Sequence, residues 1–208
     1  MKKELIKVIL GGLLPFSFNV LAAKTKELPP ECKKSCQTRY GLFLGVTQDG
    51  VEAFSNCSSE CVVFDPHRYQ GTYTGIKWQC VEYARRWLLV TRGVVYGSVD
   101  YAYEIWDKIS ELSSPKGEKK ISLQNINNGE IRNLKKGDLI IWSKDYKNTG
   151  HIAVVLEYDQ KKMEIKVAEE NYLNKVWPED YARKIKIKKI KTGLKIDEKF
   201  VLGIKRME

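Results

Sequence analysis

The chain has 208 residues, which is enough for one domain with its own hydrophobic core. Its formal net charge of +10 favours acidic polymers or anionic membranes as partners and disfavours cationic ligands. The lysines are dispersed and no nucleic-acid recognition motif is present, so we expect no nucleic-acid partner.

The first 22 residues have the organisation of a secretory signal peptide. Lysines dominate its start, residues 8–20 are mostly apolar, and a small-residue cleavage site ends at Ala22. Pro15 and Asn19 interrupt the apolar run, which is shorter than the roughly 20 residues of a membrane anchor. We therefore expect residues 1–22 to be removed, the remainder to be periplasmic or secreted, and no stable membrane anchor to remain.

The cysteines agree with an oxidising compartment. Two Cys-x-x-x-Cys pairs are formed by Cys32, Cys36, Cys57 and Cys61. If the segment between the pairs folds back on itself, Cys36 bonds to Cys57 and Cys32 to Cys61, and we favour this nested pairing. Other pairings, and a four-cysteine zinc site of the kind that suits cytosolic proteins, remain open. We expect no metal and a structural role for these four cysteines.

The first half of the exported chain carries the predicted helices. Residues 40–54 are predicted as a hairpin that turns at an Asp-Gly pair, and residues 56–74 as a loop. Residues 79–92 are predicted as an amphipathic helix that the following glycine ends. A second helix is predicted over residues 101–112, and a surface excursion over the Gly-, Pro- and Asn-punctuated residues 113–130.

The second half is predicted to be rich in strands, because β-branched and aromatic residues concentrate there. The predicted strands are residues 137–142, 151–158, 163–168, 184–187 and 200–205. Helices followed by a strand-rich half indicate an α+β fold with an antiparallel sheet.

Cys80, the fifth cysteine, stands at the start of the predicted helix 79–92. Unpaired backbone N–H groups and the helix dipole favour a thiolate at this position. His151 opens a predicted strand, and Glu169 follows the end of another. A cysteine, a histidine and a carboxylate or amide on separate elements form the pattern of a thiol hydrolase. The other histidine, His67, lies beside a proline in the predicted loop and is interpreted as a surface residue.

Three motifs carry a resemblance to a known family. Residues 77–86, 150–153 and 168–171 resemble the CHAP superfamily of cysteine, histidine-dependent amidohydrolases/peptidases, in particular the amidase domains of glutathionylspermidine synthetase/amidase and trypanothione synthetase. The resemblance implies a papain-like α+β fold with N-terminal helices packed on an antiparallel β-sheet. We expect this domain over residues 40–208, after a disulfide-bearing lead-in at residues 23–39.

The resemblance also implies roles for individual residues. Cys80 would be the nucleophile, His151 the general base and then acid, and Glu169 the group that orients the imidazole. The residues lining the oxyanion hole or contacting substrate would be Gln79, Arg85 and Asn171. Asn171 would share a face with Glu169 on an extended strand, so it remains the alternative partner of His151.

These observations predict a monomeric, exported thiol amidohydrolase/peptidase that needs no cofactor. Its substrate would be a peptide or another amide, with the peptides of peptidoglycan as first choice. Two alternatives remain open: an amidase of glutathionylspermidine or another polyamine conjugate, and a non-catalytic binding or effector module. Glu170 stands where the glutathionylspermidine amidase motif has a glutamine.

Overall fold

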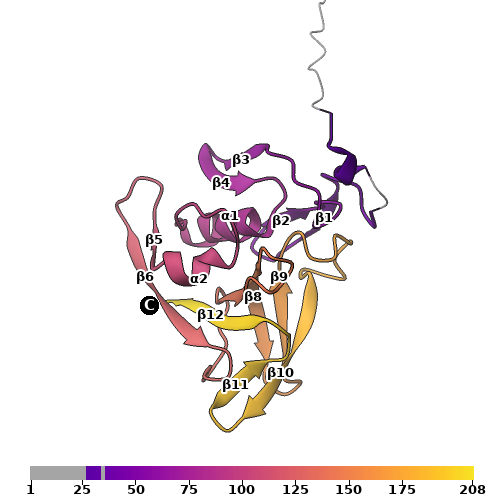
Figure 1. The fold of residues 1–208 in the computed structure, drawn as a ribbon. Coiled ribbons are helices and arrows are strands. Elements are labelled where there is room, and N and C mark those ends of the chain that lie inside the picture. The colour runs from indigo at the N-terminus through magenta and orange to yellow at the C-terminus, as the bar shows by residue number, and fades with distance from the viewer. Residues whose placement is uncertain (1–26, 34–35) are drawn as a thin grey trace, which may run out of the picture.

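The computed structural model describes residues 27–33 and 36–208, and the expected signal peptide lies outside these residues. Its largest element is an eight-stranded antiparallel sheet with the strand order β11-β10-β9-β8-β7-β12-β6-β5 (Figure 1). The helices of the described part are few: η1 (Pro30–Cys32), α1 (Cys80–Arg92) and α2 (Glu104–Lys108). The structure is therefore mostly β.

The strands fall into one large sheet and two separate hairpins. The large sheet contains β5 (Glu111–Ser113), β6 (Lys120–Asn127), β7 (Leu139–Trp142), β8 (His151–Asp159), β9 (Glu164–Ala168), β10 (Arg183–Ile190), β11 (Gly193–Ile196) and β12 (Val201–Met207). The hairpins are formed by β1 (Phe43–Val46) with β2 (Glu52–Phe54), and by β3 (Pro66–Tyr69) with β4 (Thr72–Ile76).

The large sheet is buried on both faces at its centre, because β7 is apolar at every position. Leu139 and Ile141 point into a core that also contains Trp87 and Leu88 of α1. Alternate residues of the same strand point into a second core enclosed by strands and loops. The helix that carries Cys80 thus shares a core with the strands β7 and β8, and it contacts β4 as well (Figure 1).

Several predicted elements are confirmed. The helix predicted over residues 79–92 is α1, and Gly93 ends it in the left-handed conformation with a φ of 69°. The hairpin predicted over residues 40–54 is β1–β2, with Gly50 at a φ of 78° in its turn. The strands predicted in the second half correspond to β7, β8, β9, β10 and β12.

Other predictions were wrong. The helix predicted over residues 101–112 is reduced to α2, because Glu111–Ser113 forms β5 and Ser113 also pairs with Val95. The surface excursion predicted over residues 113–130 contains β6, which pairs with β12. The loop predicted over residues 56–74 contains β3 and the start of β4.

The disulfides follow the nested pairing. Cys32 is bonded to Cys61 and Cys36 to Cys57, and together with Val63 the four cysteines form a small core of their own. Such bonds persist in oxidising compartments. Among the helices of the described residues, none combines the length and the apolar character that a membrane crossing needs.

Candidate active site

Cys80 is the first residue of α1 and the cysteine that remains outside the disulfides. Gln79 precedes it in an extended conformation, and the carbonyl of Gln79 accepts the first hydrogen bond of the helix, from the N–H of Tyr83. The side chain of Cys80 is mostly buried. The sulfur therefore lies where the N-terminal N–H groups of a helix stabilise negative charge.

His151 is the first residue of β8 and is almost completely buried. Its ring packs against Trp142, Tyr146 and Tyr172, with centroid distances of 5.2, 5.8 and 5.5 Å. Gly150 enters the strand with a φ of 66°, and a β-carbon there would lie 2.6 Å from the carbonyl oxygen of Trp142. A glycine is thus required for the turn that delivers His151 to this aromatic enclosure.

His151 contacts both other residues of the expected triad. Its Nε2 lies 2.8 Å from Oε2 of Glu169. Cys80 is its other partner, close enough to act on the imidazole through its charge and by hydrogen bonding. Burial alone would lower the pKa of His151, but the charge of Cys80 and the hydrogen bonds to Cys80 and Glu169 raise it to about 9. Cys80 and Glu169 together therefore favour the protonated form of the imidazole.

Glu169 directly follows β9, and its side chain is only 2% exposed. Burial raises the pKa of its carboxyl, but the charge of Arg183 and the hydrogen bond to His151 together hold it below its ordinary value. Arg183 also pairs with Glu198. The sequence did not single out Arg183 or Glu198, because Arg183 begins a strand of alternating lysine and isoleucine and looks like another exposed cation.

Asn171 does not contact His151 through any hydrogen bond of the described residues; it donates instead to Oε1 of Gln79, at 2.8 Å. The expectation that Asn171 shares a face with Glu169 was wrong. The strand β9 ends at Ala168, and Asn171 has a φ of 57°, which turns its side chain out of the strand's alternation.

The side-chain amide of Gln79 is held on both ends. Besides accepting from Asn171, it donates through Nε2 to Oδ1 of Asn56 and to the carbonyl of Cys61, at 3.2 and 3.3 Å. Because Cys61 belongs to a disulfide, the residue before Cys80 is supported by the cross-linked segment of the chain.

Arg85 lies elsewhere than expected of a substrate-binding residue. Its guanidinium donates to the carbonyls of Thr74 and Gly97, at 3.1 and 2.7 Å, and stacks over the ring of Tyr96. The side chain is buried. In this structure Arg85 ties α1 to β4 and to the segment that follows the helix.

A second group of charges is buried beside α1. Glu82 accepts hydrogen bonds from Arg86 and Thr74, and it lies 2.8 Å from Nδ1 of His67. Arg86 also donates to Glu170, at 2.9 Å. The interpretation of His67 as a surface residue was wrong, because the hairpin β3–β4 brings it against α1.

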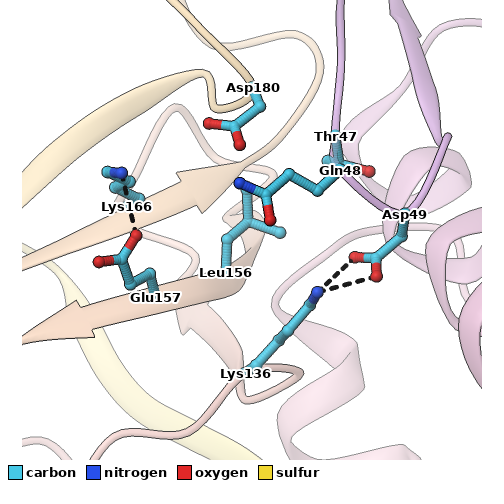
Figure 2. A pocket seen from close by; sticks show the side chains of 8 residues that line it. All are labelled: Thr47, Gln48, Asp49, Lys136, Leu156, Glu157, Lys166 and Asp180. Atoms are coloured by element: carbon cyan, nitrogen blue, oxygen red, sulfur yellow. Dashed lines mark hydrogen bonds and ion pairs between the residues drawn. The ribbon is translucent and has the colours of Figure 1, made fainter.

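The part of the chain that the structure describes contains no group of three or more His, Cys, Asp or Glu side chains able to hold a metal ion. One polar hollow lies between the β1–β2 turn and the strands β8 and β9, with Gln48 reaching into it (Figure 2). It offers about 40 Å³, and four of its five charged side chains are paired, Lys136 with Asp49 and Lys166 with Glu157. That space suits a few water molecules and not a peptide.

Comparison with known proteins gives a family and a set of relatives. Residues 69–171 match the family model described as "CHAP domain". The chain is 33% identical over 152 residues to the bifunctional glutathionylspermidine synthetase/amidase of Escherichia coli (strain K12), which covers 67% of this chain and 24% of the relative. It is 26% identical over 166 residues to the trypanothione synthetase of Crithidia fasciculata, which covers 79% of this chain and 25% of the relative.

The chain spans about a quarter of the length of the curated relatives it matches. The segment matched by the family model contains Cys80, His151 and Glu169, the three side chains that meet at the N-terminus of α1. On these matches, this chain belongs to the CHAP domain family.

Proposed function

We propose that this protein is an exported cysteine amidase/hydrolase that cleaves amide bonds through Cys80, His151 and Glu169. The observation that carries the proposal is the contact chain from Cys80 through His151 to Glu169, buried at a helix N-terminus. The raised pKa of His151, about 9, supports a protonated imidazole beside Cys80 at neutral pH. In this proposal the fold is papain-like, with α1 as the nucleophile helix packed on the sheet.

The chemistry follows from these positions. The sulfur of Cys80 attacks the amide carbonyl, and the tetrahedral oxyanion is stabilised by the backbone N–H of Cys80. Such a donor contributes about 3–4 kcal/mol. The expected role of Gln79 in this step is not retained, because its N–H groups donate to Asn56, Cys61 and Ile76. His151 then gives its proton to the leaving amine and activates the water that hydrolyses the thioester. Glu169 orients the imidazole and offsets its charge throughout.

We further propose that the protein acts outside the cytoplasm. Its two disulfides fit an oxidising compartment. Removal of residues 1–22 as a signal peptide would leave the disulfide-bearing lead-in, residues 23–39, and one amidase domain over residues 40–208. We propose that the exported form is monomeric.

The substrate that location and charge favour is the peptide part of peptidoglycan, since an exported basic protein meets anionic cell-wall polymer. A second candidate is glutathionylspermidine or a related polyamine conjugate. The 33% identity to a protein named glutathionylspermidine synthetase/amidase favours it, whereas the net positive charge of the chain disfavours a cationic substrate.

The decisive experiment offers the purified mature protein both muropeptides and glutathionylspermidine, and detects new amino groups and product masses. Cys80→Ala is the control and should release nothing from either substrate. Release from muropeptides alone supports the first substrate, and release from glutathionylspermidine alone supports the second. Binding without release from a broad set of amides would overturn the proposed activity and favour a non-catalytic module.

A further inference from the structure

Glu169 has a different partner for each of its carboxylate oxygens. Oε2 lies 2.8 Å from Nε2 of His151, and Oε1 accepts a hydrogen bond from Nε of Arg183. Because the side chain is 2% exposed, water does not take the place of either partner. The carboxylate cannot rotate without losing both contacts, so Arg183 determines its orientation as much as His151 does.

Arg183 is itself held from three directions. Its two terminal nitrogens face the carboxylate of Glu198, one of them at 3.3 Å from Oε2. The guanidinium carbon lies 3.7 Å from the centroid of the Tyr172 ring. On β10, Arg183 pairs with Val167 of β9, which lies two residues before Glu169. The register of the sheet therefore places a planar, rigidly held guanidinium group beside Glu169. A lysine would not reproduce this geometry.

We propose that Arg183 is a positioning residue of this site, which fixes the Glu169 carboxylate against His151 and supplies the positive charge that a buried carboxylate needs. Glu198 completes the arrangement by holding the guanidinium from its other side. The inference rests on the proposed function, and it extends that function to two residues that lie outside the segment matched by the family model.

The proposal has a consequence for pH dependence. The titratable and charged groups around Glu169, from every element that packs on it, are Cys80 of α1, Tyr146 of the β7–β8 loop, His151 of β8, Tyr172 after β9, Arg183 of β10 and Glu198 before β12. Burial raises the pKa of Glu169, and Arg183 is the strongest of the influences that lower it. Without Arg183, Glu169 would take up a proton at a higher pH and leave the imidazolium without its acceptor. The acid limit of activity, which is the pH below which activity is lost, would then move to higher pH.

The test compares Arg183→Met and Arg183→Lys with a matched control, Arg206→Met. Arg206 is a similarly buried arginine, 15% exposed against 13% for Arg183, that pairs with Asp138 away from the site. Two readouts are followed across pH: kcat/KM on whichever amide the wild type cleaves, and the rate at which iodoacetamide alkylates Cys80, mapped by mass spectrometry. The second readout needs no substrate.

We expect Arg183→Met to raise the acid limit of both readouts by about 1–3 pH units, the effect of removing an opposite charge in contact. Arg183→Lys keeps the charge, so its limit should stay near that of the wild type while kcat falls. Arg206→Met should leave both profiles unchanged. An unshifted alkylation profile in folded Arg183→Met, or an equal shift in Arg206→Met, would overturn the proposal.

Glu198→Gln provides a test of opposite sign that does not depend on the stability of Arg183→Met. Removing the second carboxylate leaves the full charge of Arg183 to Glu169, so the acid limit should move to lower pH; an upward shift contradicts the proposal. The two proposals also fail separately. If no amide is hydrolysed but the alkylation profiles shift as expected, the proposed function is wrong and the role of Arg183 stands.

Discussion

Glu169 and Glu170 are neighbours in the chain, yet their side chains enter two different buried ionic clusters. The site cluster consists of Cys80, His151, Glu169, Arg183 and Glu198. The strut cluster consists of His67, Glu82, Arg86 and Glu170. Both are built from carboxylates, a histidine and an arginine, so residue types alone do not distinguish them.

The clusters differ in how their charges are arranged around the histidine. In the site cluster, His151 lies between Cys80 and Glu169, and its pKa is raised to about 9. In the strut cluster, burial raises the pKa of Glu82. The hydrogen bonds from His67, Arg86 and Thr74 and the charge of Arg86 outweigh this effect and lower the pKa to about 2. The first arrangement places a proton beside a thiol. The second holds a buried charge whose contacts connect α1 with β3 and with the residues that follow β9.

The largest expected difference in activity is between two variants that carry the same substitution, Glu to Gln, at adjacent positions. Glu169→Gln should lower kcat/KM by up to about 10⁴-fold, because an amide in place of a triad carboxylate misorients the imidazole and cannot offset its charge. Glu170→Gln should stay within about threefold of the wild type, a change under 1 kcal/mol. Burial already raises the pKa of Glu170, so a neutral amide resembles its protonated form. Equal losses in the two variants would show that the clusters do not divide the roles in this way.

The next effect concerns the stability of the fold. Arg86→Met leaves the charge of Glu82 buried without its cation and removes the partner of Glu170, which should reduce the free energy of unfolding by about 3–5 kcal/mol. Urea denaturation followed by circular dichroism measures this loss. At a temperature where the variant is folded, the acid limit of Cys80 alkylation should match that of the wild type. A shifted limit would place Arg86 in the site cluster as well.

His151 of the site cluster and Glu82 of the strut cluster should make the stability of the fold change with pH in opposite directions. The pKa of His151 is raised from 6.5 to about 9, so its stabilising contribution is complete below pH 6.5 and is lost as the pH rises through 9. This contribution is on the order of 3 kcal/mol. The pKa of Glu82 is lowered from 4.5 to about 2, so its contribution is present above pH 4.5 and is lost as the pH falls through 2.

Free energies of unfolding measured at several pH values check both signs. His151→Gln should remove the alkaline loss and leave the acid loss intact. Glu82→Gln should reduce the acid loss and leave the alkaline loss intact; the acid loss that remains comes from carboxylates such as Glu169, whose pKa is also lowered. An alkaline loss that persists in His151→Gln would assign it to another group.

The sequence was sufficient to predict the site residues that lie at the starts of elements with a clear hydrophobic pattern. Cys80 starts the amphipathic helix and His151 starts an apolar strand, so local pattern places both. Arg183 could not be found in this way, because only its pairing with Val167 across two strands distinguishes it from the exposed lysines that follow it. Long-range register of this kind leaves no local signal.

The misread elements have the same physical origin. In β6, Ile121 and Leu123 alternate with polar residues, but Gln124 and Asn125 are both exposed and break the period of two. Residues 101–112 contain enough apolar side chains for a helix, and the pairing of Ser113 with Val95 overrides that preference. In both segments tertiary pairing decided the structure.

The smallest expected effect on activity is that of Arg85→Met. The family resemblance assigns Arg85 a role toward substrate or in support of the site, whereas its hydrogen bonds here go to the carbonyls of Thr74 and Gly97. Losing them should reduce the free energy of unfolding by about 1–3 kcal/mol, because buried carbonyls are left unpaired. The value of KM should stay within about threefold of the wild type, a change under 1 kcal/mol. A tenfold rise in KM with unchanged stability would mean that Arg85 leaves these carbonyls when substrate binds. Arg85 would then belong neither to the charges that only support the fold nor to those that take part in the reaction.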